Sequence, residues 1–303
     1  MQIMSLITAL PGAAAQGLIW GIMAIGVYIT FRILDIADLT VDGTLCTGGA
    51  VCIMMMLSGH NVWVSMLVAT GAGLLAGLAT GIFHTFMGIP AILAGILTQL
   101  SLYSINLKIM GKANQAINVD KFNLLVSLRR VKGVALTQNT LFIVAIMIII
   151  LIAVLYWFFG TELGCSLRAT GCNPSMSRAQ GINTDRNKVL GLMLSNGLVA
   201  LSGALLTQYQ GFADINMGRG SIVIGLAAVI IGEAIFSRIF RNFALKLLSV
   251  VFGSILYYLV LQIVIWMGID TDLLKMLSAL VVALFLAFPI LEGQILYKSQ
   301  TGR

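Results

Sequence analysis

The chain has 303 residues, of which 59% are hydrophobic and only 10% charged, and its mean hydropathy is +1.01. This composition excludes a water-soluble globular protein and indicates an all-α, polytopic membrane protein. The apolar runs are continuous rather than alternating, which argues against a β-barrel. The net charge of +7 reflects membrane topology first, so we expect a lipid membrane and no nucleic acid as partner.

The apolar runs predict about nine transmembrane helices in one domain over residues 1–303. No Lys or Arg precedes Arg32, so we interpret the first run as a retained span and not as a signal peptide. The predicted spans are 12–31, 44–57, 62–83, 91–107, 141–160, 189–209, 222–236, 247–267 and 276–291.

Three carboxylates lie between the first two spans, at Asp35, Asp38 and Asp42. Their spacing puts them on one side of the segment if it is helical, whereas Asp42 could equally cap the second span. We favour capping and solvation at the membrane interface over a cation site, because calcium requires more oxygen ligands.

Two long polar intervals interrupt the apolar pattern, at residues 108–139 and 161–188. The second carries four basic side chains against two acidic ones, which places it in the cytoplasm by the positive-inside bias. With about nine spans, the N-terminus is then outside and the basic C-terminal tail, with Lys298 and Arg303, is cytoplasmic. Residues 108–139 are expected outside although they are basic, so either they form an external lobe or one span is miscounted.

The cytoplasmic interval contains a Gly-Cys-Asn-Pro break and then a short run, 175–180, that can form one or two amphipathic turns. Such a knob suits docking in a partner's groove, although a plain connecting loop is the general alternative.

Two segments share the spacing of their small residues and point to an internal repeat. Gly43-Thr44 with Gly48 and Ala50 corresponds to Gly220-Ser221 with Gly225 and Ala227. The first opens a span that leaves the cytoplasm and the second a span that enters it, which is typical of an inverted repeat in transporters. Small residues at ordinary helix contacts are the other explanation.

Catalysis by this chain is not expected, because the spans hold no catalytic constellation and no Walker A loop. Glu233 is the one acid well inside an apolar run, and we interpret it as a snorkelling or packing residue. The four cysteines, Cys46, Cys52, Cys165 and Cys172, have spacings that support neither a metal site nor a disulfide framework.

Three stretches, ADLTVDGTLCTGGAV (37–51), LRATGCNPSMSRAQGIN (167–183) and 198–236, resemble the permease subunit of bacterial ABC importers of the branched-chain amino acid and ribose type. The middle stretch carries the most specific match, through Gly171-x-Asn173, Ser177-Arg178 and Gly181-Ile182-Asn183. The variant around Asp38 and Asp42 is similar to the tryptophan and tyrosine permease subgroup, so we expect uptake of a small solute, with an amino acid favoured.

The resemblance implies a bacterial inner-membrane homodimer that works with an ATP-binding cassette subunit and an extracytoplasmic substrate-binding protein. This chain would carry no cofactor or metal, while ATP and magnesium would bind the partner ATPase. The residues expected to couple to that ATPase are Ala169, Thr170, Gly171, Cys172, Asn173, Pro174, Ser175, Met176, Ser177, Arg178, Ala179 and Gln180. Hypothetical pathway residues are Thr40, Thr44, Thr47, Asn216 and Ser221. An ion-coupled secondary transporter is the alternative, since an inverted repeat fits it too.

Overall fold

The computed structural model describes residues 2–119, 122, 124–131, 139–236, 239–240 and 242–268, followed by 273, 276, 279–280 and 282–283. Six of its helices are long and apolar enough to cross a membrane, and two more, α2 (Val41–Leu57) and α9 (Ser221–Phe236), are shorter apolar helices. The predicted class of an all-α, polytopic membrane protein is therefore confirmed.

The six long helices account for six of the predicted spans. They are α1 (Gln2–Tyr28), α3 (Val62–Thr85), α4 (Ala91–Met110), α5 (Thr140–Gly160), α8 (Thr184–Gln210) and α10 (Phe243–Trp266). A π-helical turn, η1 (Ile29–Ile33), extends α1, and a 3-10 turn, η2 (Leu128–Val131), precedes α5. The ninth predicted span and the basic tail lie largely outside the described residues, so the count of nine stays a prediction.

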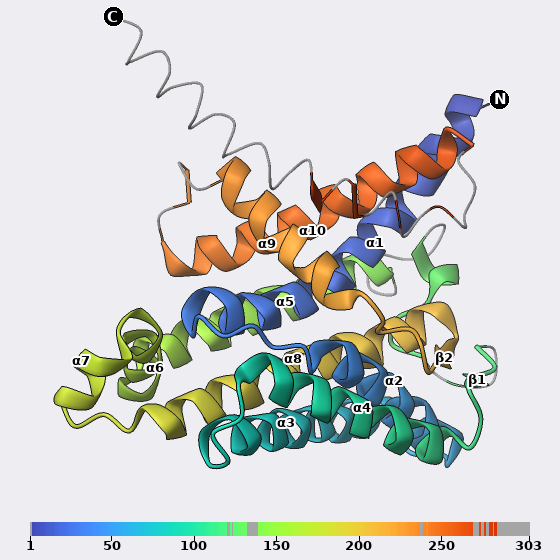
Figure 1. The fold of residues 1–303 in the computed structure, drawn as a ribbon. Coiled ribbons are helices and arrows are strands. Elements are labelled where there is room, and N and C mark those ends of the chain that lie inside the picture. Colours follow the sequence, from blue (N-terminus) through green and yellow to red (C-terminus); the bar gives the residue numbers. More distant parts are fainter. Residues whose placement is uncertain are drawn as a thin grey trace, which may run out of the picture.

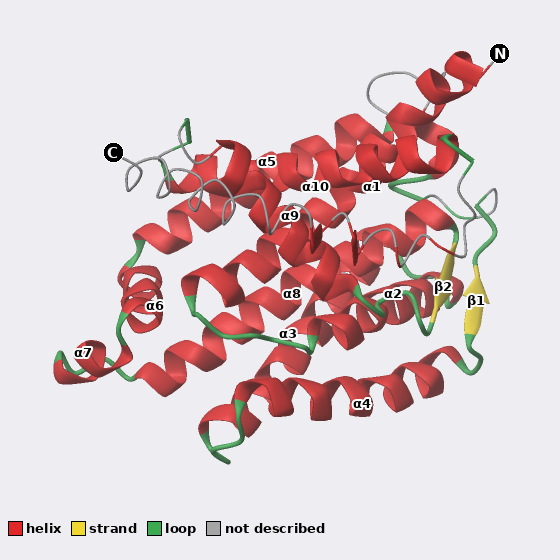
Figure 2. Cartoon of the chain, turned by 45° about the horizontal axis from the view of Figure 1, so that its top comes forward, coloured by secondary structure: helices red, strands yellow, loops and turns green. Residues whose placement is uncertain are grey.

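Two features mark opposite ends of the molecule (Figure 1). The short helices α6 (Glu162–Cys172) and α7 (Pro174–Ala179) lie at one end, and the strands β1 (Asn114–Ala116) and β2 (Phe212–Asp214) lie at the other (Figure 2). The strands pair antiparallel, with Gln115 opposite Ala213, and so join the interval 108–139 to the segment after α8. The described parts of the two long polar intervals therefore lie at opposite ends of the molecule, as the external-lobe alternative requires. Which side of the membrane each interval faces stays a prediction.

Helices α1 and α8 form the centre of the bundle, whereas α5 is mostly exposed and suited to lipid contact. Serine hydroxyls tie neighbouring helices to the backbone of α1. Ser195 and Ser202 of α8 donate to the carbonyls of Gly26 and Ile19 at 2.8 Å, and Ser254 of α10 donates to a further α1 carbonyl, that of Gly17, at 2.7 Å. In lipid, such bonds between helices replace the hydrophobic effect that water would supply.

Helices α2 and α8 approach so closely that only glycine fits at their contact. A Cβ atom at Gly203 would lie 2.0 Å from the carbonyl oxygen of Leu45, and one at Gly48 would lie 2.0 Å from that of Ala200. The opposing atoms are backbone, so they cannot turn away as a side chain would. The small residues that suggested a repeat thus serve helix packing as well.

We predict that Gly203→Ala lowers the melting temperature of the detergent-purified chain, because the added methyl group forces α2 and α8 apart at a cost of about 1–3 kcal/mol. Gly71→Ala in α3 is the matched control, since its Cβ would meet no atom within 4 Å. Equal melting temperatures for the two variants would contradict the close contact.

Candidate functional site

The second polar interval contains two short helices, α6 and α7, that we call the elbow (residues 161–183). Thr161 caps α6 by accepting from the amide of Gly164, and Asn173 caps α7 by accepting from Met176 at 3.0 Å. The break at Asn173-Pro174 lies where the sequence predicted it. Helix α7 coincides with the predicted amphipathic turns at 175–180. The sequence analysis did not predict α6, whose capped turns bury Leu167 and Thr170 against the bundle.

Polar contacts fix the elbow to the first turn of α8. Asn187 donates to the Thr170 hydroxyl at 2.8 Å, and the Nε atom of Arg178 donates to the Thr184 hydroxyl at 2.8 Å. Arg178 also faces Asp185 across 3.7 Å. The elbow is therefore a preformed projection and not a loose connection.

The predicted coupling residues, 169–180, differ in how far they are exposed. Thr170 and Ser177 are buried against the body, Gly171 is half-buried, and the remaining members are exposed. Met176 on α7 is the large apolar side chain of this set, and 62% of its surface is exposed. An exposed methionine on a rigid turn suits insertion into an apolar groove.

The elbow also touches the end of the first helix. A Cβ at Gly171 would lie 1.7 Å from the carbonyl oxygen of Ile33, so α6 rests directly on η1. The next residue, Leu34, lies against both Gly171 of α6 and Gly191 of α8. Any movement of the elbow therefore acts on η1, at the end of α1, and on the start of the segment that carries Asp35, Asp38 and Asp42. Single π-helical turns recur at functional sites.

The segment after Leu34 takes part in a buried polar network around Asp38. Residues 35–38 are not helical, and Asp38 is 3% exposed. Its carboxylate accepts from the amide of Thr40 at 2.9 Å and from the side-chain amide of Asn196, in α8, at 2.7 Å. Thr44 donates to the oxygen of Asn196 at 2.7 Å. The expectation of interface solvation was therefore wrong for Asp38.

Asp42 connects the two segments of the proposed repeat. One carboxylate oxygen accepts from the Ser221 hydroxyl at 2.8 Å and from the amide of Ile222 at 3.0 Å, and the other accepts from the amide of Gly220 at 2.9 Å. Asp42 therefore caps α9 and not its own helix, α2. The alternative that Asp42 caps the second span was wrong. A carboxylate at a helix N-terminus also meets the positive end of the helix dipole.

The structure places the hypothetical pathway residues in two environments. Thr40, Thr44, Thr47 and Ser221 are buried within the chain, and Asn216 is exposed in the segment before α9. Thr40 shares a hydrogen bond of 2.7 Å with Thr80 of α3. Their role in a pathway stays a prediction.

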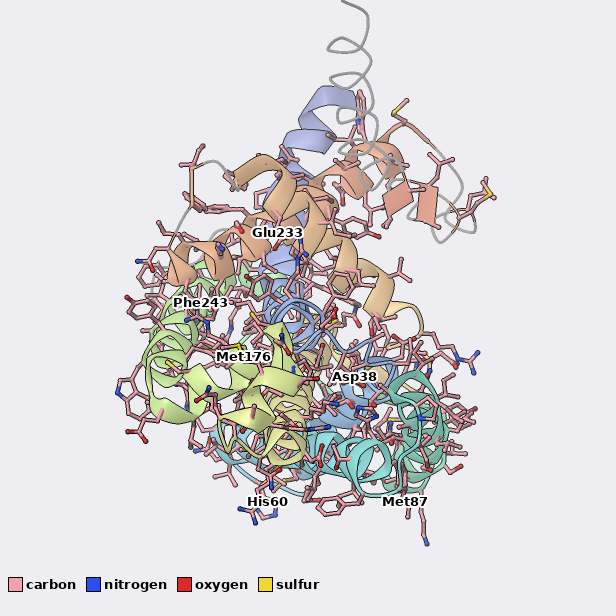
Figure 3. The ribbon with its side chains drawn as sticks, turned by 60° about the vertical axis from the view of Figure 1, so that its left-hand side comes forward. Asp38, His60, Met87, Met176, Glu233 and Phe243 are labelled. Carbon is pink, nitrogen blue, oxygen red and sulfur yellow. The ribbon has the colours of Figure 1, made fainter. Side chains whose placement is uncertain are left out.

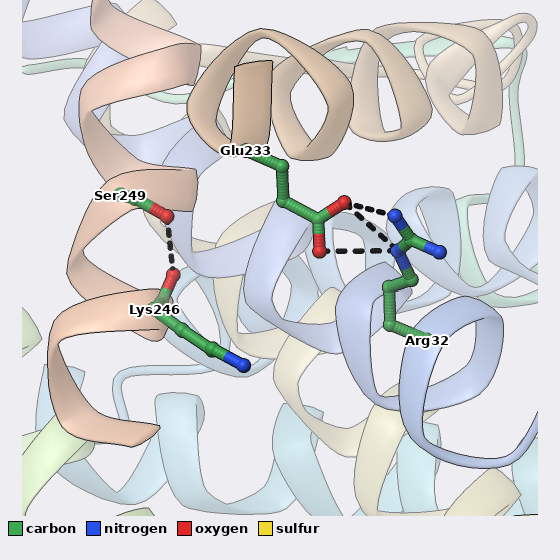
Figure 4. A network of polar contacts seen from close by, with 4 residues as sticks. All are labelled: Arg32, Glu233, Lys246 and Ser249. Carbon is green, nitrogen blue, oxygen red and sulfur yellow. Dashed lines mark hydrogen bonds and ion pairs between the residues drawn. The ribbon is translucent and has the colours of Figure 1, made fainter. Parts of the chain in front are cut away.

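A second ionic contact lies near the elbow end of the bundle. Glu233 of α9 accepts from Arg32 of η1, with Nε at 3.0 Å from one oxygen and 2.9 Å from the other (Figure 4). A cavity of about 430 Å³ adjoins this pair and also contacts Lys246 and Ser249. The carboxylate of Glu233 is therefore ion-paired, and the pair ties α9 to the end of α1.

Comparison of the sequence with known proteins shows the family to which the chain belongs. The model of the family "Branched-chain amino acid transport system / permease component" matches residues 10–287, which is most of the chain. The chain belongs to this permease family. A tyrosine transport system permease protein of Clostridioides difficile (strain R20291) is 39% identical over 272 residues, covering 90% of this chain and 88% of the relative.

Two further matches to this permease are a relative named for a sugar and a solved structure. The fructose import permease FruF of Bifidobacterium longum (strain NCC 2705) is 25% identical, covering 81% of this chain and 67% of the relative. Among solved structures, PsaBC from Streptococcus pneumoniae in complex with Fab matches with a TM-score of 0.43 and 19% identity, covering 86% of this chain and 95% of that one.

Sequence reasoning missed the partners of the buried polar groups in this permease. Asp38 and Asn196 are far apart in the chain, and nothing local indicates that they pair. The signal that was available is the presence of an uncompensated amide within an apolar span, which implies a polar partner on another helix.

We predict that Asp38→Ala and Asn196→Ala each destabilise the permease by about 1.5–3 kcal/mol, the range for a hydrogen bond to a charged group. Removing Asn196 leaves a buried carboxylate with one donor fewer, whereas the double variant removes both partners. Thermal unfolding in detergent should show that the double variant loses less than the sum of the singles. Simple additivity would mean that the two side chains do not interact.

Proposed function

We propose that this permease is the membrane-spanning subunit of an ATP-driven importer that takes up an amino acid. The observation that carries the proposal is the 39% identity to the tyrosine transport permease over nine-tenths of this chain. Tyrosine is therefore the first solute to test. The fructose permease is more distant, at 25% identity.

The elbow is the proposed docking surface for a separate ATP-binding subunit. Its exposed face presents Met176, while Thr170 and Ser177 hold it to the body of the permease. In this mechanism, closure of the ATPase pushes the elbow against Ile33 and Leu34, and the segment that holds Asp38 transmits the displacement to α2 and α9. A partner of this kind acts only through different contacts in the two states of the permease.

Two further partners complete the proposed importer. A second copy of the permease would complete the pathway, and an extracytoplasmic binding protein would deliver the solute at the β1–β2 end. ATP and magnesium would bind the ATPase, so we assign no cofactor and no catalytic step to this chain. The assembly would lie in a bacterial inner membrane, with the elbow on the cytoplasmic side.

We predict that Met176→Glu weakens association with the ATPase at least tenfold, because a charge replaces the exposed apolar side chain of α7. The matched control is Met87→Glu, since Met87 is 64% exposed on a different element, the turn between α3 and α4 (Figure 3). Both variants should keep the melting temperature of the parent. Equal binding by the two variants in a pull-down of the co-expressed ATPase would show that the elbow is not the docking surface.

The proposed function itself is tested by gentle solubilisation from the native membrane, followed by mass spectrometry of what co-purifies. We expect an ATPase with a Walker A loop in stoichiometric amount. A permease that purifies alone and still transports tyrosine in liposomes with an ion gradient would establish the secondary transporter instead.

A further inference from the structure

A group of charged and polar side chains surrounds the start of α9. Arg219 and Asn216 are exposed in the segment that precedes this helix, and Asp42 lies beside them at the start of α2. The guanidinium of Arg219 lies over the ring of Tyr103, a residue of α4, at 6.0 Å from the ring centre. Gln99 lies one helical turn before Tyr103 and on the same face of α4.

This group lies beside the middle of α4, one of the six helices that are long and apolar enough to cross a membrane. A Cβ at Gly43 would lie 3.2 Å from the Cα atom of Gln99, so the start of α2 is level with the middle of the 20-residue helix α4. Tyr103 is roughly 10 Å from the nearer end of α4, at about 1.5 Å of rise per residue. An arginine exposed at this depth does not face lipid, because charged side chains within the membrane face a protein contact or a water-filled cavity.

The guanidinium of Arg219 has no ionic partner in this group. Asp42 keeps its negative charge, and its two oxygens accept from Gly220, Ser221 and Ile222 at the N-terminus of α9. No carboxylate within the described part of the chain forms an ion pair with the guanidinium of Arg219. This guanidinium can therefore pair with a carboxylate that the chain itself does not supply.

We propose that Arg219, supported by Tyr103, is the intramembrane site that binds the carboxylate of the transported solute. This inference rests on the proposed function and specifies it, because it selects solutes with a carboxylate group over neutral sugars. The guanidinium provides two parallel donors that match a carboxylate, and the aromatic ring below limits its movement. Asn216, adjacent and exposed, offers an amide to the polar remainder of the same solute.

The test uses the complete importer, with its ATPase and binding protein, reconstituted in liposomes and supplied with labelled L-tyrosine. With saturating binding protein, Arg219→Gln should reduce the maximal rate of uptake at least tenfold, and Arg219→Lys should give an intermediate rate, because lysine keeps the charge and loses the two parallel donors. Both complexes should assemble and hydrolyse ATP at the parental rate. Lys112→Gln, which removes an equal charge from an exposed site just after α4, is the control and should transport normally.

Two outcomes would overturn the proposal. Uptake by Arg219→Gln within twofold of the parent would exclude a role in binding. Loss of assembly in Arg219→Gln, with recovery in Arg219→Lys, would mean that Arg219 pairs with a carboxylate of a second copy and not with the solute. Failure of the proposed function is seen in the parent importer instead, as uptake of fructose and no tyrosine or as uptake that needs no ATP, so the two failures are distinguishable.

Discussion

The carboxylate of Asp42 at the N-terminus of α9 is the contact on which the centre of this permease depends. Helices α2 and α9 are shorter than the six long spans, and their first turns meet within the bundle. Backbone amides at a helix start have no partner in their own helix, and lipid offers them none. A carboxylate from the other segment of the repeat satisfies them and matches the helix dipole.

This arrangement connects the elbow, through contacting residues, to the centre of the bundle. The elbow rests on Ile33, the next residue packs between α6 and α8, and the following segment holds Asp38 in a buried network with Asn196. A few residues further, Asp42 fixes the start of α9. A push on the elbow is therefore applied to the segment that positions both short helices. Arg32 and Glu233 add a second connection from the same end of α1 to α9.

Much of the fold could be predicted because lipid imposes simple rules on sequence. Continuous apolar runs must be helical, so eight predicted spans match helices, and the Gly-Cys-Asn-Pro break lies between α6 and α7. The helical state of residues 162–172 was missed because their composition is polar and their buried side, Leu167 and Thr170, is narrow.

The candidate site was less predictable, because its contacts join residues distant in sequence. The spacing of Gly43 and Gly220 indicated a repeat, but not that Asp42 would cap the opposite helix. Arg219 lies in a polar segment, and nothing in that segment indicates where its side chain lies. Only the structure shows its contact with Tyr103, in the interior of α4.

Hydrogen exchange tests the central contact most directly. The amides of Gly220 and Ile222 both donate to Asp42, so they should exchange slowly in the detergent-purified permease. Replacement of Asp42 by Ala should accelerate exchange at these two amides by at least tenfold, while the amides in the middle of α8 stay protected. Equal exchange at Gly220 and Ile222 in the parent and the variant would contradict the account.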